Sequence, residues 1–134
     1  MCFQIRRDTG LWYSVEYLWY SVEYSSYSVE YSSFAVGPEA DKYRLSVSGY
    51  SGDAGNAMMA AVHVKRIVNG MQFSSADQDN DLNGMRQCMG GKVGWWFNNC
   101  ARSLLNNDKH GVWNAVTDEP IHDVEFARMM IKLD

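Results

Sequence analysis

The chain has 134 residues, a formal net charge of −4 and a hydrophobic fraction of 46%, which is enough for one domain with its own core. A domain of this size buries about two-thirds of the surface that its unfolded chain exposes. The acidic balance argues against a nucleic-acid-binding or polybasic membrane-binding protein. No apolar run approaches the roughly 18 residues that a membrane-spanning helix requires.

The first residues, Met1–Asp8, lack an apolar stretch after a basic start and do not form a secretory signal. This leaves two interpretations of the chain. It is either a cytosolic protein or a protein whose own N-terminus is missing from this sequence.

The chain contains three cysteines, Cys2, Cys88 and Cys100. An odd number leaves one of them without an intrachain partner. A disulfide between Cys88 and Cys100 would stabilise the fold by roughly 3 kcal/mol in the chain-entropy model. Their spacing is equally compatible with two unrelated reduced thiols. A Cys2His2 zinc site is disfavoured, because neither Cys-x-x-Cys nor a close histidine pair occurs.

Residues 11–36 are repetitive with a period of seven. Tyr-Ser-Val-Glu-Tyr occurs at 13–17, 20–24 and 27–31, and a decayed copy follows at 32–36. The alternation of apolar and polar residues within each copy is typical of a strand, whereas Tyr, Val and Ser are poor choices for a coiled coil.

An odd repeat length conflicts with the two-residue period of a strand. Each successive copy turns its apolar set to the opposite face. We therefore predict one real strand plus local duplications, with the surplus copies forming a hairpin or remaining disordered. This gives an irregular repeat segment over residues 1–30, partly disordered or strand, followed by a domain over residues 31–134.

Two further strands are predicted. Tyr43, Leu45 and Val47 alternate with polar residues and predict a core strand after the Gly37-Pro38 break. Near the C-terminus, alternation from Ala127 to Leu133 predicts a closing strand. Residues 69–94, rich in Gly, Asn, Asp and Ser, read as a long loop region of the kind that is usually functional or tied down.

The acidic run Asp77–Gly84 places three carboxylates within five residues. Their mutual repulsion is relieved by a hard cation with oxygen ligands. An EF-hand does not fit, because Leu82 stands where that loop needs Gly and Cys88 where it needs Glu. Taken alone, the run is either a calcium loop or a solvated acidic turn.

The second local signal is the aromatic run Trp95-Trp96-Phe97, which leads into Cys100. Indole rings buried near polar loops usually need a partner for their N–H group. At least one Trp is expected to plug the core beneath the acidic loop, and the alternative is a wall of a ligand pocket.

Catalytic motifs are absent from the sequence. No nucleophile elbow, zinc-protease helix or phosphate loop occurs. His63, His110 and His122 lie among polar neighbours and are expected at the surface. We predict that the chain is not an enzyme.

In order and spacing, these segments resemble the fibrinogen C-terminal domain family, which includes fibrinogen chains, ficolins, tachylectins, angiopoietins and tenascins. The resemblance covers about residues 27–134 and is looser after Cys100. The family's N-terminal half is missing here. The matching segments are Tyr31–Val36, Tyr43–Leu45, Gly49–Gly55, Asn69–Ser74, Asp77–Asp81, Cys88 and Gly94–Cys100.

The resemblance implies an α+β fold, mainly an antiparallel sheet with long loops stabilised by calcium and a disulfide. It implies a secreted, calcium-dependent recognition module for acetylated sugars or an extracellular protein ligand, with oligomers possible in the parent protein. It implies a disulfide between Cys88 and Cys100.

The resemblance also implies a calcium site and a ligand pocket. Asp79 and Asp81 would give carboxylates, and carbonyls near Asn83 and Met85 would complete the protein ligands. One residue more than usual separates Asp81 from Cys88. The residues implied for one wall of the pocket are Trp96, Phe97 and Ala101.

Departures from the family pattern motivate an alternative. The aromatic loop before the closing strand is largely gone between Asn107 and Trp113, and Ala101 stands where lectin-like members carry a polar residue. The chain would then be a truncated or mis-assembled fragment without a competent pocket.

Overall fold

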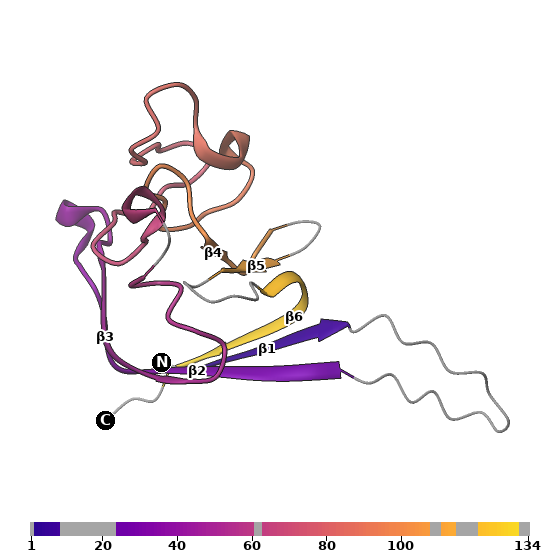
Figure 1. Cartoon of the computed structure of the whole chain (residues 1–134). Coiled ribbons are helices and arrows are strands. Elements are labelled where there is room, and N and C mark those ends of the chain that lie inside the picture. Colours follow the sequence, from indigo (N-terminus) through magenta and orange to yellow (C-terminus); the bar gives the residue numbers. More distant parts are fainter. Residues whose placement is uncertain (1, 9–23, 61–62, 108–110, 115–120, 132–134) are drawn as a thin grey trace, which may run out of the picture.

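The computed structural model describes residues 2–8, 24–60, 63–107, 111–114 and 121–131. Its six strands form one sheet in the order β3-β2-β1-β6-β5-β4, and every neighbouring pair is antiparallel (Figure 1). The strands are β1 Cys2–Asp8, β2 Tyr24–Val36, β3 Leu45–Gly52, β4 Ser103–Leu104, β5 Gly111–Trp113 and β6 Ile121–Met130.

The predicted fold class is confirmed as a mainly antiparallel sheet with long loops. Helical structure in the described parts of the chain consists of three 3-10 turns, η1 Glu39–Asp41, η2 Val64–Arg66 and η3 Cys88–Gly91. None of the helices described there is long and apolar enough to cross a bilayer.

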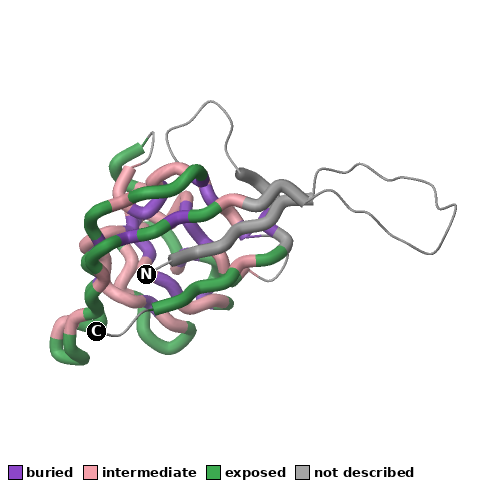
Figure 2. Tube along the Cα trace, turned by 90° about the horizontal axis from the view of Figure 1, so that it is seen from below, coloured by how far each residue is buried: buried purple, intermediate pink, exposed green. Residues whose placement is uncertain are grey.

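The sheet forms one layer, and the loop-rich segment between β3 and β4 lies above it (Figure 1). The core lies between the two, and buried positions alternate with exposed ones along the strands (Figure 2). The largest buried side chains come from both layers and are Trp113, Tyr31, Phe97, Leu45, Met58, Val29 and Val68.

The predicted core strand begins two residues later than the alternation suggested. Leu45 and Val47 are buried in β3, but Tyr43 is 46% exposed and precedes the strand. Its backbone, like that of Lys42, has a positive φ, so the chain turns there before entering the sheet. The expectation that Tyr43 shares the core face is therefore wrong. The predicted closing strand overlaps β6, which begins at Ile121, six residues earlier than the alternation suggested, and ends at Met130.

The third repeat copy and the decayed copy form one continuous strand, β2, which crosses residue 30. Its pairing with β3 keeps one register from Val29↔Gly52 to Val36↔Leu45. Val29 and Tyr31 are buried, and so is Val47, the partner of Phe34. By strand alternation these two groups point to opposite faces. The earlier copies fall mainly on residues 9–23, outside the described residues.

The β2–β3 ribbon therefore exchanges its buried side near its middle, where Figure 1 shows both strands bending. Gly49 sits at this point with a φ of 68°, and a Cβ there would collide with the side chain of Ser32. The sequence argument was right that successive copies face opposite sides. It missed that a bent ribbon can bury both.

Polar contacts attach the loop layer to the sheet. The Tyr31 hydroxyl donates to Asn56 Oδ1 at 2.9 Å, and the Trp113 indole N–H donates to the Gly55 carbonyl at 2.9 Å. The Ser28 N–H donates to Asp53 Oδ1 at 2.6 Å. These bonds hold residues 53–56 over the sheet and fix where the loop layer starts.

Tyr31→Phe should lower the free energy of unfolding by about 1 kcal/mol, because the substitution leaves the Asn56 oxygen without its donor. Thermal denaturation at pH 7 should show a melting temperature lower by about 3–5 °C. Burial raises the pKa of Tyr31 in the folded protein, although a hydrogen bond from the Met58 backbone opposes this shift.

The raised pKa favours the neutral phenol in the folded state. Tyr31 therefore costs stability as the pH rises above about 10, where the unfolded chain ionises. The deficit of Tyr31→Phe should shrink at pH 11. Tyr43→Phe, which changes an exposed ring, is the matched control. It should leave the melting temperature unchanged at both pH 7 and pH 11. An equal loss in the control would contradict the assigned role of Tyr31.

Candidate functional site

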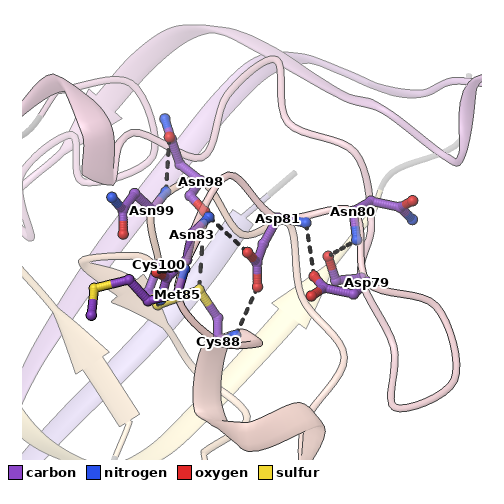
Figure 3. The surroundings of a disulfide bond; sticks show 10 residues. Asp79, Asn80, Asp81, Asn83, Met85, Cys88, Asn98, Asn99 and Cys100 are labelled. Atoms are coloured by element: carbon purple, nitrogen blue, oxygen red, sulfur yellow. Dashed lines mark hydrogen bonds between the residues drawn. A yellow bond between two sulfur atoms is a disulfide. The ribbon is translucent and has the colours of Figure 1, made fainter.

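The acidic loop is wound by three successive turns in which a side chain accepts from the backbone two residues on (Figure 3). Asp79 Oδ1 accepts the Asp81 N–H at 3.1 Å, and Asp81 Oδ1 accepts the Asn83 N–H at 2.8 Å. Asn83 Oδ1 then accepts the Met85 N–H at 3.2 Å. The short side chains of Asp and Asn favour such turns. The four residues of the predicted calcium set therefore form one hydrogen-bonded series.

Further bonds tie this loop to the rest of the chain. The second carboxylate oxygen of Asp81 accepts the Cys88 N–H at 2.7 Å, so both of its oxygens are engaged. The Leu82 N–H donates to the Asn98 carbonyl at 3.0 Å, and the Asn80 amide donates to the Phe73 carbonyl at 2.6 Å. The loop is held at its start, middle and end.

Asp77, the first carboxylate of the run, lies outside this series. It is exposed and accepts a bond of 2.8 Å from the Ser75 hydroxyl. That bond lowers the pKa of Asp77. Nowhere in the described residues do three or more His, Cys, Asp or Glu side chains form a metal-binding group. A cation in this loop would have to use two carboxylates together with carbonyl or water oxygens.

A disulfide joins Cys88 to Cys100, with their Cα atoms 5.4 Å apart. It links η3, just after the acidic loop, to the end of the aromatic run. The Asn83 amide lies 3.7 Å from Cys100 Sγ. The side chain of Cys2, predicted to be free, lies outside the described part of the structure.

The aromatic run packs into the core beneath the loop, as one of the two interpretations expected. Trp95 and Phe97 are 3% and 1% exposed. The half-buried Trp96 donates its indole N–H to the Tyr43 carbonyl at 2.8 Å and meets Phe73 edge-on at 5.3 Å. Phe97 is thus too buried to contact a ligand, and Trp96 faces Tyr43 and Phe73.

A hollow of about 750 Å³ lies beside the disulfide. Of the three residues implied for a pocket wall, Ala101 is the one found among its lining residues. The lining also includes Asn83 from the acidic loop and side chains that the sequence argument did not single out, namely Arg66, Arg86, Gln87, Met89, Lys92, Asn99 and Asn107.

A second hollow of about 510 Å³ is lined by His63, Val64, Lys65, Arg66 and Asn99. Because Arg66 and Asn99 line both hollows, the two are adjacent. The basic pair Lys65-Arg66 was the sequence signal that could have located this surface.

Asn98 holds the basic turn η2, whose residues line both hollows. Its buried side-chain amide donates to the Ile67 carbonyl at 2.9 Å and to the Val64 carbonyl at 3.4 Å. The Asn99 N–H donates to the Lys65 carbonyl at 2.9 Å. The basic turn η2 is therefore fixed against the segment that carries Cys100.

The family model for the C-terminal globular domain of fibrinogen beta and gamma chains matches residues 12–132. The chain belongs to the fibrinogen C-terminal domain family. This fibrinogen-like chain is 43% identical to the fibrinogen beta chain of Gallus gallus over 76 residues, 46% of this chain and 16% of the relative. It is 38% identical to angiopoietin-4 of Bos taurus over 110 residues, 72% of this chain and 20% of the relative.

A techylectin-like protein of Phoneutria nigriventer is 42% identical over 69 residues, 51% of this chain and 28% of the relative. The fibrinogen-like globe domain of human ANGPTL2 superposes with a TM-score of 0.58 at 28% identity, over 81% of this chain and 43% of that structure. Lamprey fibrin D-dimer, complexed with the peptide Gly-His-Arg-Pro-amide, gives 0.57 at 25% identity, over 88% and 37%. The fibrinogen-like chain thus spans less than half of each of these proteins.

Non-reducing peptide mapping of the fibrinogen-like chain should recover a Cys88–Cys100 linked peptide and a free thiol at Cys2. The double variant Cys88→Ser/Cys100→Ser should lose roughly 3 kcal/mol of unfolding free energy, as expected for opening a loop of this length. Cys2→Ser is the control and should melt like the wild type. A linkage from Cys2 to either partner would contradict this assignment.

Proposed function

We propose that the chain is an extracellular recognition module that binds an acetylated sugar or a short peptide in the hollow beside its disulfide, with calcium ordering the site. The observation that carries the proposal is the bond from the Cys88 N–H to the Asp81 carboxylate. Because Cys88 lines the hollow, whatever orders the acidic loop also orders a wall of the site.

The acidic loop is chemically suited to a hard cation. Asp79 and Asp81 offer carboxylate oxygens, and the backbone near Asn83 and Met85 offers carbonyls. Asp79 is exposed and Asp81 is half-buried, so water can complete the six to eight ligands that calcium takes. So modest a charge count supports a dissociation constant on the order of 10⁻⁴–10⁻³ M, as in extracellular modules.

The hollow has the size of a small-ligand site, since such sites run from about 300 to 1,000 Å³. One relative is named a techylectin-like protein, which supports a sugar ligand. A similar solved structure is a fibrin D-dimer complexed with a peptide, which supports a peptide ligand. Asn83 and Asn99 place amide groups on the lining, and amides can both donate to and accept from a polar ligand.

An extracellular site of action fits the disulfide, because such bonds persist in oxidising compartments. Recognition also fits the comparisons better than catalysis does, because the matched relatives are fibrinogen, angiopoietin and lectin-like proteins.

A specific observation favours a weakened site as the second candidate. Trp96 and Phe97 pack into the core, which leaves Ala101 with no aromatic neighbour among the described lining residues. The Ala101 side chain offers no hydrogen bond to a ligand. A fragment with a folded but poorly competent hollow would show this geometry.

Calcium at about ten times its dissociation constant should stabilise the wild type by about 1.4 kcal/mol, or roughly 4 °C in melting temperature. Asp79→Asn and Asp81→Asn should abolish this gain. Each keeps an oxygen for its backbone turn but removes a charge. Asp77→Asn is the matched control, because Asp77 bonds to Ser75 instead, and it should retain the gain.

Differential scanning fluorimetry with calcium, magnesium and chelator measures these effects. A wild type whose melting temperature does not respond to millimolar calcium would show that the site does not form. An equal loss in Asp77→Asn would show that general acidity, and not this loop, is responsible.

N-acetylglucosamine should bind the calcium-loaded chain roughly ten- to a hundredfold more weakly than it binds an intact lectin-like relative. The reason is that a ligand atom left without its hydrogen-bond partner costs about 1–3 kcal/mol. Ala101→Asn should recover part of the loss by restoring a donor. Calorimetric titration measures both affinities, and saturable binding by the wild type at the relative's affinity would contradict this expectation.

A further inference from the structure

The two adjacent hollows concentrate positive charge on a chain whose net charge is −4. Their described lining residues include no Asp or Glu, whereas five histidine, lysine and arginine side chains line them. These are His63, Lys65, Arg66, Arg86 and Lys92. Arg66 belongs to both linings and stands where the hollows meet.

These charges are available to a ligand. Among the described residues, a salt bridge joins Arg44 to Asp41, and neither of these residues lines a hollow. The side chains of Arg66, Arg86 and Lys92 make no hydrogen bond or ion pair to the residues that the structure describes. The backbone beneath Lys65 and Arg66 is nevertheless fixed by Asn98 and Asn99, so the position from which these two side chains extend is defined.

We propose that the two hollows form one continuous site for an acidic polysaccharide, with sulfate or carboxylate groups contacting Arg66 at the junction, Lys65 on one side and Lys92 on the other. This inference rests on the proposed recognition function, and it names a ligand class that the hollow beside the disulfide does not reveal by itself. Charge complementarity carries the proposal, because buried or partly buried anionic groups require paired cations.

The lining chemistry favours a saccharide over other polyanions. Neither described lining contains Trp, Tyr or Phe, so the large stacking platforms that single-stranded nucleic acids use are missing there. Neither contains a residue of a strand, so an acidic peptide has no sheet edge on which to pair. The side-chain amide of Asn99 lies at the junction and can both donate to and accept from sugar hydroxyls.

The overall charge of the chain makes the test selective. A net negative protein repels polyanions outside its local basic surface, so binding must depend on the residues of the hollows. Interactions between exposed charges are screened within about 8 Å at physiological ionic strength. Retention should therefore decline with salt while remaining specific for the basic residues that line the site.

Retention on immobilised dextran sulfate, with neutral dextran as the uncharged matched matrix, tests the proposal. The calcium-loaded full chain should bind dextran sulfate and pass through dextran. Arg66→Gln should weaken solution binding of dextran sulfate roughly tenfold or more, as loss of a charge-assisted hydrogen bond does, and Lys92→Gln should weaken it in the same direction. Lys42→Gln changes the net charge equally at a residue that lines neither hollow, and should bind like the wild type.

Each alternative result is decisive. Equal losses in Lys42→Gln and Arg66→Gln would overturn the site in favour of nonspecific charge attraction. Tighter binding of polyglutamate than of dextran sulfate would overturn the choice of a saccharide. Calcium-dependent binding of dextran sulfate that Arg66→Gln and Lys92→Gln leave unchanged would assign the anion to the metal and overturn the role of the basic side chains.

The result is independent of the proposed function's own tests. Binding of N-acetylglucosamine without binding of dextran sulfate would reject the present inference alone. Binding of dextran sulfate in a chain that shows neither calcium stabilisation nor acetylated-sugar binding would reject the proposed function alone.

Discussion

The carboxylate of Asp81 is the constraint on which the rest of the site depends. One oxygen closes a turn with Asn83 and the other accepts the Cys88 N–H, so a single side chain couples a polar loop to a covalent crosslink. The disulfide carries that coupling to Cys100, directly after the aromatic run that fills the core. The acidic loop, the disulfide and the core are thus joined by direct bonds, although almost no regular secondary structure connects them.

This arrangement explains how a long, irregular segment can present a defined surface. Backbone groups in a loop lack the repeating partners of a helix or sheet and must be satisfied one by one. Here Asn80, Asn98 and Asp81 satisfy them from their side chains. The many Asn and Asp residues of this segment therefore have a structural role, because their side chains bond to the loop backbone. The charged side chains between them remain at the solvent-facing walls of the hollow.

The sequence predicted what depends on local pattern. Alternation identified β3 and part of β6, and the aromatic run identified the core plug that Trp95 and Phe97 form. It could not predict that Phe97 would be fully buried while Ala101 lines a hollow, because that depends on how the crosslinked segments pack. It also missed the basic surface, because Arg66, Arg86 and Lys92 are separated in the sequence and line one hollow only in the folded chain.

The exchange of buried face along β2 has a consequence for how such a chain can change by duplication. In a flat sheet with one buried face, a duplicated seven-residue unit would place its aromatic side chains on the solvent-exposed face. The inserted segment would then be prone to associate with other chains. A ribbon bent at Ser32 and Gly49 offers core on either side of the bend. Tyr31 and Phe34 point to opposite faces of the ribbon, and both can therefore pack against other residues of the chain. A repeat of odd length is tolerated here, although a flat strand with one buried face would expose one of its copies.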